Sequence, residues 1–247
     1  MSDIHSNLSQ RVLAASMELR DSVNGMQFAE PTTHVYNPLD YAWEPYADYV
    51  QKFAHPNVDV VFLGMNPGPW GMAQVGVPFG EIEAVRNWMG VQGTVTRPQY
   101  EHAKRPIDGF ACQRSEVSGR RLWGLFRDRF GSADKFFQNH FVLNYCPLVF
   151  MEASGRNRTP DKLSAPERQQ LHEACDAHLR KVVEWMQPSW LIGIGKFAAS
   201  RAVEAGLAPG VNVEWILHPS PASPAANRDW AGMAERKLID IGVWSDR

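Results

Sequence analysis

Residues 58–63 read VDVVFL and run directly into the loop GMNPGPWGMAQVGVPFG, residues 64–80. The first part is a short apolar run with β-branched and aromatic residues, which is typical of a buried strand. The second part holds five glycines and three prolines in seventeen residues. It predicts a loop that is stiff at each proline and can approach a ligand closely at each glycine. Long loops of this kind in compact domains are usually functional.

Three further runs share this character and predict buried strands: FVLNY at 141–145, WLIGI at 190–194 and VEWIL at 213–217. Amphipathic patterns typical of helices lie before, between and after the strands. These patterns cover residues 8–23, 118–130, 165–187, 197–205 and 229–239. The alternation predicts an α/β fold, a three-layer sandwich with a central four-stranded parallel sheet flanked by helices.

The remaining segments carry weaker signals. The stretch YNPLDYAWEPY, residues 36–46, indicates an irregular packed segment. Residues 100–112 and 151–160 indicate long surface loops. Ser164 and Glu167 stand in the S-x-x-E order of a capping box, which predicts a helix start at that point.

The composition favours one globular domain, residues 1–247, because 44% of the residues are apolar and can fill a core. The formal net charge is −2, so a nucleic-acid contact must use a local basic face. The three cysteines form no C-x-x-C pair, which indicates a reducing compartment. The sequence has no signal core and no spanning segment. We therefore expect a soluble protein that is not secreted, cytoplasmic in a bacterium or nuclear in a eukaryote.

Two polar residues follow predicted strands, where parallel sheets bind ligands outside the carboxyl ends of their strands. Asn66 can hold a water by donating and accepting hydrogen bonds, but Asn-Pro is also typical of a simple turn. His218 opens the segment HPSPASPAANRDW, residues 218–230. It can donate to a developing anion, or it can merely cap a proline-stiffened turn. Composition leaves both interpretations open for each residue.

The loops at 64–80 and 218–230 closely resemble the two motifs of the single-strand-selective monofunctional uracil-DNA glycosylases, within the uracil-DNA glycosylase superfamily. The segments at 141–151 and 36–46 are similar to that family too, so the resemblance runs from about residue 36 to residue 230. It implies an enzyme that flips a damaged nucleotide out of DNA and hydrolyses its N-glycosidic bond, leaving an abasic site. It also implies that no cofactor, no metal and no covalent lysine intermediate take part.

The resemblance implies two catalytic residues. Asn66 matches the residue that positions the attacking water, and His218 matches the donor that stabilises the leaving uracil anion at O2. No carboxylate precedes Glu81 in the first motif. A weakly activated water is sufficient if the bond breaks dissociatively and leaves an oxocarbenium-like sugar.

The resemblance also implies a base-binding pocket. Asn144 matches the residue that reads O4 and N3–H of uracil, and Phe79 matches the ring on which the base stacks. Without the resemblance, an ordinary strand-end amide stays open as an alternative for Asn144, and Phe79 is typical of a core residue. Gly68 leaves room beside C5, which implies that 5-substituted uracils such as 5-hydroxymethyluracil are accepted. Met65 and Met72 match residues that line this pocket.

The second loop matches the segment that wedges into the duplex as the base leaves. The residues expected to contact DNA are Pro219, Ser220, Pro221, Ala222, Ser223 and Arg228. Ala222 stands where the family has an arginine, which predicts weaker extrusion from duplexes than from single strands. We expect single- and double-stranded DNA with deaminated or oxidised pyrimidines as the partner, no membrane partner, and a monomer.

Two other functions fit the same pattern of strands and loops. A hydrolase of free nucleosides would have the pocket without a DNA-binding surface, and the proline-rich projection after His218 argues against it. A non-catalytic binder of damaged DNA would not need both Asn66 and His218.

Overall fold

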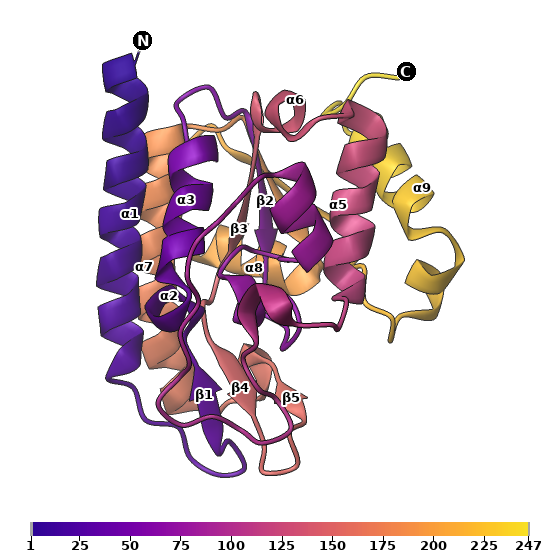
Figure 1. Ribbon diagram of the computed structural model, residues 1–247. Coiled ribbons are helices and arrows are strands. Elements are labelled where there is room, and N and C mark those ends of the chain that lie inside the picture. The colour runs from indigo at the N-terminus through magenta and orange to yellow at the C-terminus, as the bar shows by residue number, and fades with distance from the viewer. Residues whose placement is uncertain (1, 247) are drawn as a thin grey trace.

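The computed structural model of the chain describes residues 2–246, with side chains from residue 7 onward. Its centre is a parallel four-stranded sheet in the order β3-β2-β6-β7 (Figure 1). The strands are β2 (Val60–Gly64), β3 (His140–Asn144), β6 (Trp190–Ile194) and β7 (Asn212–Ile216). The four predicted strands are all present, each within two residues of its predicted bounds.

Helices cover both faces of this sheet, which confirms the three-layer prediction (Figure 1). The helices of one face are α1 (Ser2–Asn24), α3 (Trp43–Phe53), α7 (Ala165–Met186) and α8 (Lys196–Glu204). Those of the other face are α5 (Val117–Phe130), α6 (Ala133–Phe137) and α9 (Pro224–Asp240). On the first face α1 packs against α3 and α7, and on the second α5 packs against α6 and α9.

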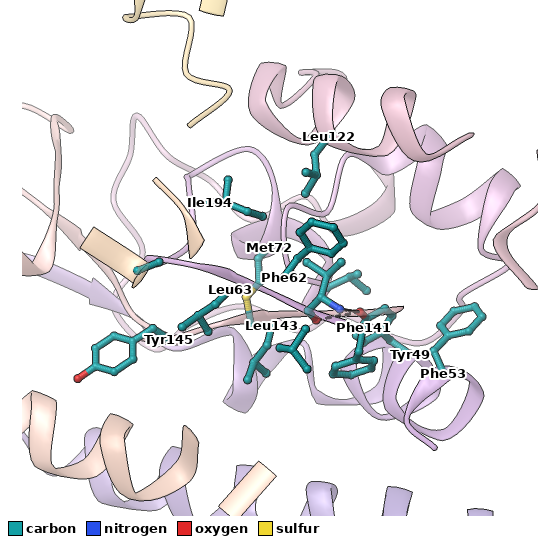
Figure 2. Close-up of a cluster of buried hydrophobic side chains, with 14 of the residues drawn as sticks. Tyr49, Phe53, Phe62, Leu63, Met72, Leu122, Phe141, Leu143, Tyr145 and Ile194 are labelled. Carbon is teal, nitrogen blue, oxygen red and sulfur yellow. Dashed lines mark hydrogen bonds between the residues drawn. The ribbon is translucent and has the colours of Figure 1, made fainter. Parts of the chain in front are cut away.

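The core lies on both sides of the sheet because successive residues of a strand point to opposite faces. Figure 2 shows Phe62 on the side of Leu122, whereas Phe141 lies on the side of Tyr49. The ring of Phe62 packs against Phe126 of α5 at a centroid distance of 5.0 Å. The ring of Phe141 stacks on Tyr49 of α3 at 5.2 Å. This burial on both faces explains why β2 is apolar along its whole length.

The predicted helix-end signals are present. Ser164 and Glu167 form the capping box at the start of α7, and Oε2 of Glu167 accepts from the backbone N–H of Ser164 at 2.8 Å. Gly131 follows α5 with a φ of 79°, a conformation that glycine adopts without steric cost. No helix within residues 2–246 is long and apolar enough to cross a lipid bilayer.

The prediction of an irregular segment at 36–46 is wrong. This stretch contains the end of β1 (His34–Tyr36), all of α2 (Pro38–Tyr41) and the start of α3. The side chain of Asn37 caps α2 by accepting from the backbone N–H of Leu39 at 3.2 Å. Proline at the first position of α2 lacks only an N–H that the helix does not use. One helical turn is too short to show a periodic pattern.

The prediction of a plain loop at 151–160 is also wrong, because part of it forms a hairpin. Strand β4 (Val149–Met151) pairs with β1 on one side and with β5 (Asn157–Arg158) on the other, in a second, antiparallel sheet of order β1-β4-β5. This small sheet lies at one end of the molecule (Figure 1). Strands of two or three residues give no hydrophobic alternation for a sequence pattern to reveal.

Helix α9 begins earlier than predicted, at Pro224 rather than near Asp229. The side chain of Ser223 accepts from the backbone N–H of Ala226 at 3.3 Å and caps this first turn. The helix is kinked at Asp229, where φ is −159°. Its first turn therefore lies within residues 218–230, the predicted second loop.

Candidate active site

The carboxyl ends of β2, β3 and β7 meet at one edge of the central sheet. Gly64 pairs with Asn144 in register. The pairing continues past the strands, since the N–H of Cys146 donates to the carbonyl of Met65 at 2.9 Å. Asn66, Asn144 and His218 come from segments far apart in the sequence, and this edge brings them together.

A cavity of about 440 Å³ opens at this edge. Its volume lies in the range of small-molecule sites. The walls include every residue predicted to contact the base or the water: Met65, Asn66, Gly68, Met72, Phe79, Asn144 and His218. Of the residues predicted to contact DNA, Ser220 and Pro221 also line the cavity, whereas Pro219, Ala222, Ser223 and Arg228 do not.

The side chain of Asn66 has a fixed orientation. Its Nδ2 donates to the carbonyl oxygen of Leu148 at 3.0 Å and more weakly to that of Pro67 at 3.4 Å. With the nitrogen held in this way, Oδ1 remains as an acceptor. Such an acceptor can hold and orient a water molecule.

His218 lies against Phe79 at a ring-centroid distance of 6.1 Å. A Cβ on Gly195 would stand 3.3 Å from the Cβ of His218, so the glycine makes room for this close approach. Burial lowers the pKa of His218 from 6.5 to about 4, so the imidazole is neutral at neutral pH. A neutral imidazole still carries one N–H, which can donate to a developing anion.

Asn144 is buried, with a relative exposure of 6%. Its Nδ2 contacts Sδ of Met72 at 3.2 Å, while its Oδ1 has no hydrogen-bond partner within residues 2–246. A buried acceptor without a partner costs free energy, and a ligand that donates to it recovers this cost. A Cβ on Gly64 would lie 2.2 Å from this Oδ1, so only glycine fits beneath it.

Phe79 has a strained backbone, with a φ of 53° that non-glycine residues rarely adopt. Two donors hold its carbonyl oxygen: Nε1 of Trp123 at 3.0 Å and the N–H of Glu81 at 2.7 Å. A Cβ on Gly119 would stand 2.1 Å from the same oxygen. The fixed backbone aims the Phe79 ring into the cavity, and strain of this kind gathers at functional sites.

Glu116 lines the cavity and was not predicted. It precedes α5, where its Oε1 accepts from the backbone N–H of Ser118 at 3.3 Å. It also accepts from the backbone N–H of Trp70, and burial raises its pKa above the ordinary value. Its Oε2 lies 2.7 Å from the place a Cβ on Gly68 would take. The first loop contains no carboxylate. Glu116, directly before α5, places one next to that loop.

Other walls of the cavity come from residues outside the predicted site. Asn157 and Thr159 belong to the hairpin region, and Ser118 belongs to the first turn of α5. A signal for Glu116 and Ser118 did exist. In a parallel α/β sheet, the helix after a strand begins near the edge where the strands end, so the start of α5 must lie close to the cavity.

Arg121 of α5 holds the second loop in place. Its Nη1 donates to the carbonyl oxygen of Pro219 at 3.1 Å, and its Nη2 donates to Oδ1 of Asn227 at 2.8 Å. Nδ2 of Asn227 in turn donates to the carbonyl of Pro221 at 2.9 Å. Ala222 and Arg228 are exposed beyond this network. The loop that carries His218 is therefore fixed by side chains as well as by proline.

Within residues 2–246 no group of three or more His, Cys, Asp and Glu side chains is arranged to hold a metal ion. The cysteines Cys112, Cys146 and Cys175 are free and buried.

The chain matches known proteins along most of its length. The model of the uracil DNA glycosylase superfamily matches residues 51–238. The chain is 47% identical over 239 residues to the single-strand selective monofunctional uracil-DNA glycosylase of Rattus norvegicus, which covers 96% of this chain and 86% of that protein. The corresponding proteins of Mus musculus and Bos taurus are 47% and 46% identical over the same length.

Among solved structures, the chain is similar in fold to wild-type SMUG2 of Pedobacter heparinus. The TM-score is 0.61 at 15% sequence identity, over 93% of this chain and 97% of that one. The sequence matches establish the family, and the structural match supports the fold. The chain belongs to the uracil-DNA glycosylase superfamily and, within it, to the single-strand-selective monofunctional family.

Proposed function

We propose that this protein hydrolyses the N-glycosidic bond of uracil and of 5-substituted uracils such as 5-hydroxymethyluracil in single- and double-stranded DNA, leaving an abasic site for base excision repair. The convergence of Asn66, Asn144 and His218 on one cavity carries the proposal. These side chains can hold a water, a pyrimidine edge and a leaving anion, which hydrolysis of a pyrimidine nucleotide requires together.

In the proposed reaction the bond from C1′ to N1 breaks first and the electron pair leaves with the base. The N–H of neutral His218 donates to O2 of the uracil anion. A water held by Oδ1 of Asn66 adds to the oxocarbenium-like sugar, and its released proton leaves to solvent. No lysine is among the described residues that line the cavity, which supports a monofunctional enzyme over one that forms a covalent imine.

Base recognition rests on Asn144 and Phe79. The unpartnered Oδ1 of Asn144 accepts from N3–H of uracil, and Nδ2 turns from the Met72 sulfur to O4. Cytosine has no N3–H and would leave Oδ1 unpaired, which a buried polar site rejects strongly. The ring of Phe79 stacks on the base, a contact worth about 1–3 kcal/mol.

A panel of oligonucleotides tests the proposal. Each would carry uracil, 5-hydroxymethyluracil, thymine or cytosine at one position, in single- and double-stranded form, with alkali cleavage of abasic sites as the readout. Cleavage at uracil and 5-hydroxymethyluracil but not at cytosine is expected. Release of uracil from free deoxyuridine but from no oligonucleotide would favour a nucleoside hydrolase instead.

A further inference from the structure

A second hollow lies next to the candidate active site, and we name it the basic groove. Its volume is about 580 Å³ and its lining consists of Trp70, residues 103–106, Asp108 and residues 111–114. Trp70 is a wall of both the active-site cavity and the basic groove. A polymer that places one unit in the cavity therefore has a path across Trp70 into the groove.

Positive charge dominates the basic groove. Lys104, Arg105 and Arg114 line it against a single acid, Asp108, which itself faces Arg97 at 3.8 Å. Within residues 2–246 none of the three cations has a carboxylate partner within 4.0 Å. In a protein of net charge −2, such unpaired cations form a local basic face.

The two guanidinium groups lie over one aromatic ring. Cζ of Arg114 lies 4.5 Å and Cζ of Arg105 lies 5.1 Å from the ring centroid of Trp70. Nε of Arg105 is buried and has no hydrogen-bond partner in the described part of the chain. A guanidinium group presents its N–H donors in one plane, where two of them bind a phosphate together.

Gln74, which is fully buried, connects the basic groove to the first loop, residues 64–80, through hydrogen bonds. Nε2 of Gln74 donates to the carbonyl of Pro69 at 3.1 Å and to that of Pro106 at 3.0 Å. Oε1 of the same amide accepts from the N–H of Asp108 at 2.9 Å. One side chain thus fixes the spacing between the groove and the loop that carries Asn66.

We propose that the basic groove binds phosphates of the DNA strand that flanks the extruded nucleotide, with Arg105 and Arg114 as phosphate ligands and Lys104 as a supporting charge. This inference rests on the proposed function. Phosphate contacts set the register of a protein on DNA, and here they hold the strand next to the cavity, across Trp70. Arg121 does not compete for this role, because it is engaged with the carbonyls of that loop.

The test uses a single-stranded 15-mer of thymidine with one central deoxyuridine. Binding is measured by fluorescence anisotropy and uracil release by alkali cleavage, both from 50 to 300 mM salt. The variants are Arg114→Gln and Arg105→Gln/Arg114→Gln. Lys135→Gln is the matched control, since Lys135 is exposed on α6, before β3. Thermal unfolding of each variant establishes that it is folded.

We expect Arg114→Gln to make the negative slope of log K against log salt less steep by about 0.7, the value for one phosphate contact on a single strand. The double variant should make the slope less steep by up to about 1.4. The control should match the native protein. Replacing single phosphates by neutral methylphosphonates should reveal one position where Arg114→Gln causes no additional loss.

A native salt slope and native affinity in the folded double variant would overturn the groove assignment. A wrong groove assignment can be told apart from a wrong proposed function. If the proposed function is wrong, the native protein releases no uracil, while the anisotropy measurement still reports whether the groove binds the strand.

Discussion

The side-chain nitrogen of Asn66 donates to the carbonyl oxygen of Leu148 across 3.0 Å. Leu148 belongs to the segment that follows β3, so one hydrogen bond ties the loop after β2 to the loop after its neighbouring strand. The bond selects one orientation of the amide and leaves Oδ1 of Asn66 able to accept a hydrogen bond from another group. The proposed mechanism depends on this orientation, because only an acceptor can align a water for attack.

Asn66→Ala should lower the single-turnover rate of uracil release by about 100- to 1,000-fold, since a positioned catalytic group contributes that much. Binding of the uracil oligonucleotide should change little, because the alanine removes no contact to the base. Rapid-quench kinetics and anisotropy measure the two effects separately. An equal loss in both would mean that Asn66 shapes the pocket and does not position the water.

His218 should not titrate in the working range of the enzyme. Its pKa is lowered to about 4 by burial, so the ring stays neutral at every pH well above that value. The rate of uracil release should therefore show no inflection near pH 6.5, and His218→Ala should lower it about 100- to 1,000-fold.

The control for this pH profile is Glu116→Gln, because the pKa of Glu116 is raised by burial. A change in rate on the acid side that disappears in Glu116→Gln belongs to that carboxyl. An inflection near pH 6.5 that persists in Glu116→Gln and is lost in His218→Ala would contradict the neutral-imidazole mechanism.

Ala222 is exposed at the tip of the second loop and offers no side chain to fill the space that a flipped base leaves. Flipping from a duplex costs a few kcal/mol, and an inserted side chain offsets part of this cost. Ala222→Arg should therefore raise the rate on double-stranded uracil DNA and leave the single-strand rate nearly unchanged. Single-turnover kinetics on both substrates test this. An unaltered duplex rate would show that Ala222 does not limit extrusion of the base from a duplex.

His140 should make the fold sensitive to acid. Its Nδ1–H donates to the carbonyl of Phe136 at 2.8 Å, and its Nε2 accepts from Nε1 of Trp244 at 3.0 Å. The bond from Trp244 needs an unprotonated Nε2, and burial lowers the pKa of His140 from 6.5 to about 4. Between these values the unfolded chain takes up a proton that the folded chain does not. The free energy of unfolding therefore falls as the pH drops through this window.

By this linkage His140 alone accounts for about 2 kcal/mol lost between neutral pH and pH 5. The pKa values of His178 and His218 are also lowered to about 4, so they act in the same direction. Urea unfolding of the native protein and His140→Gln, measured at pH 7.5 and pH 5, should show a smaller acid loss in the variant. Equal losses of unfolding free energy in the two proteins would show that groups other than His140 cause the acid sensitivity.

Hydrophobic periodicity was sufficient to predict the central sheet and the covering helices α1, α5, α7, α8 and α9, but it missed α3 and α6. It failed for β1, β4, β5 and α2, because these elements are too short to carry a period. The site divides in the same way. Asn66, Asn144 and His218 stand at strand ends, which the chain order places at one edge. Asn157 reaches the cavity through a hairpin that only tertiary packing brings there.

The central claim is that Asn66 and His218 together perform uracil release. The most direct test is single-turnover release of uracil from a single-stranded oligonucleotide by the native protein and by Asn66→Ala/His218→Ala. We predict rapid, complete release by the native protein and a loss of at least about 1,000-fold in the double variant, with oligonucleotide binding retained. Release by the double variant at the native rate would contradict this claim.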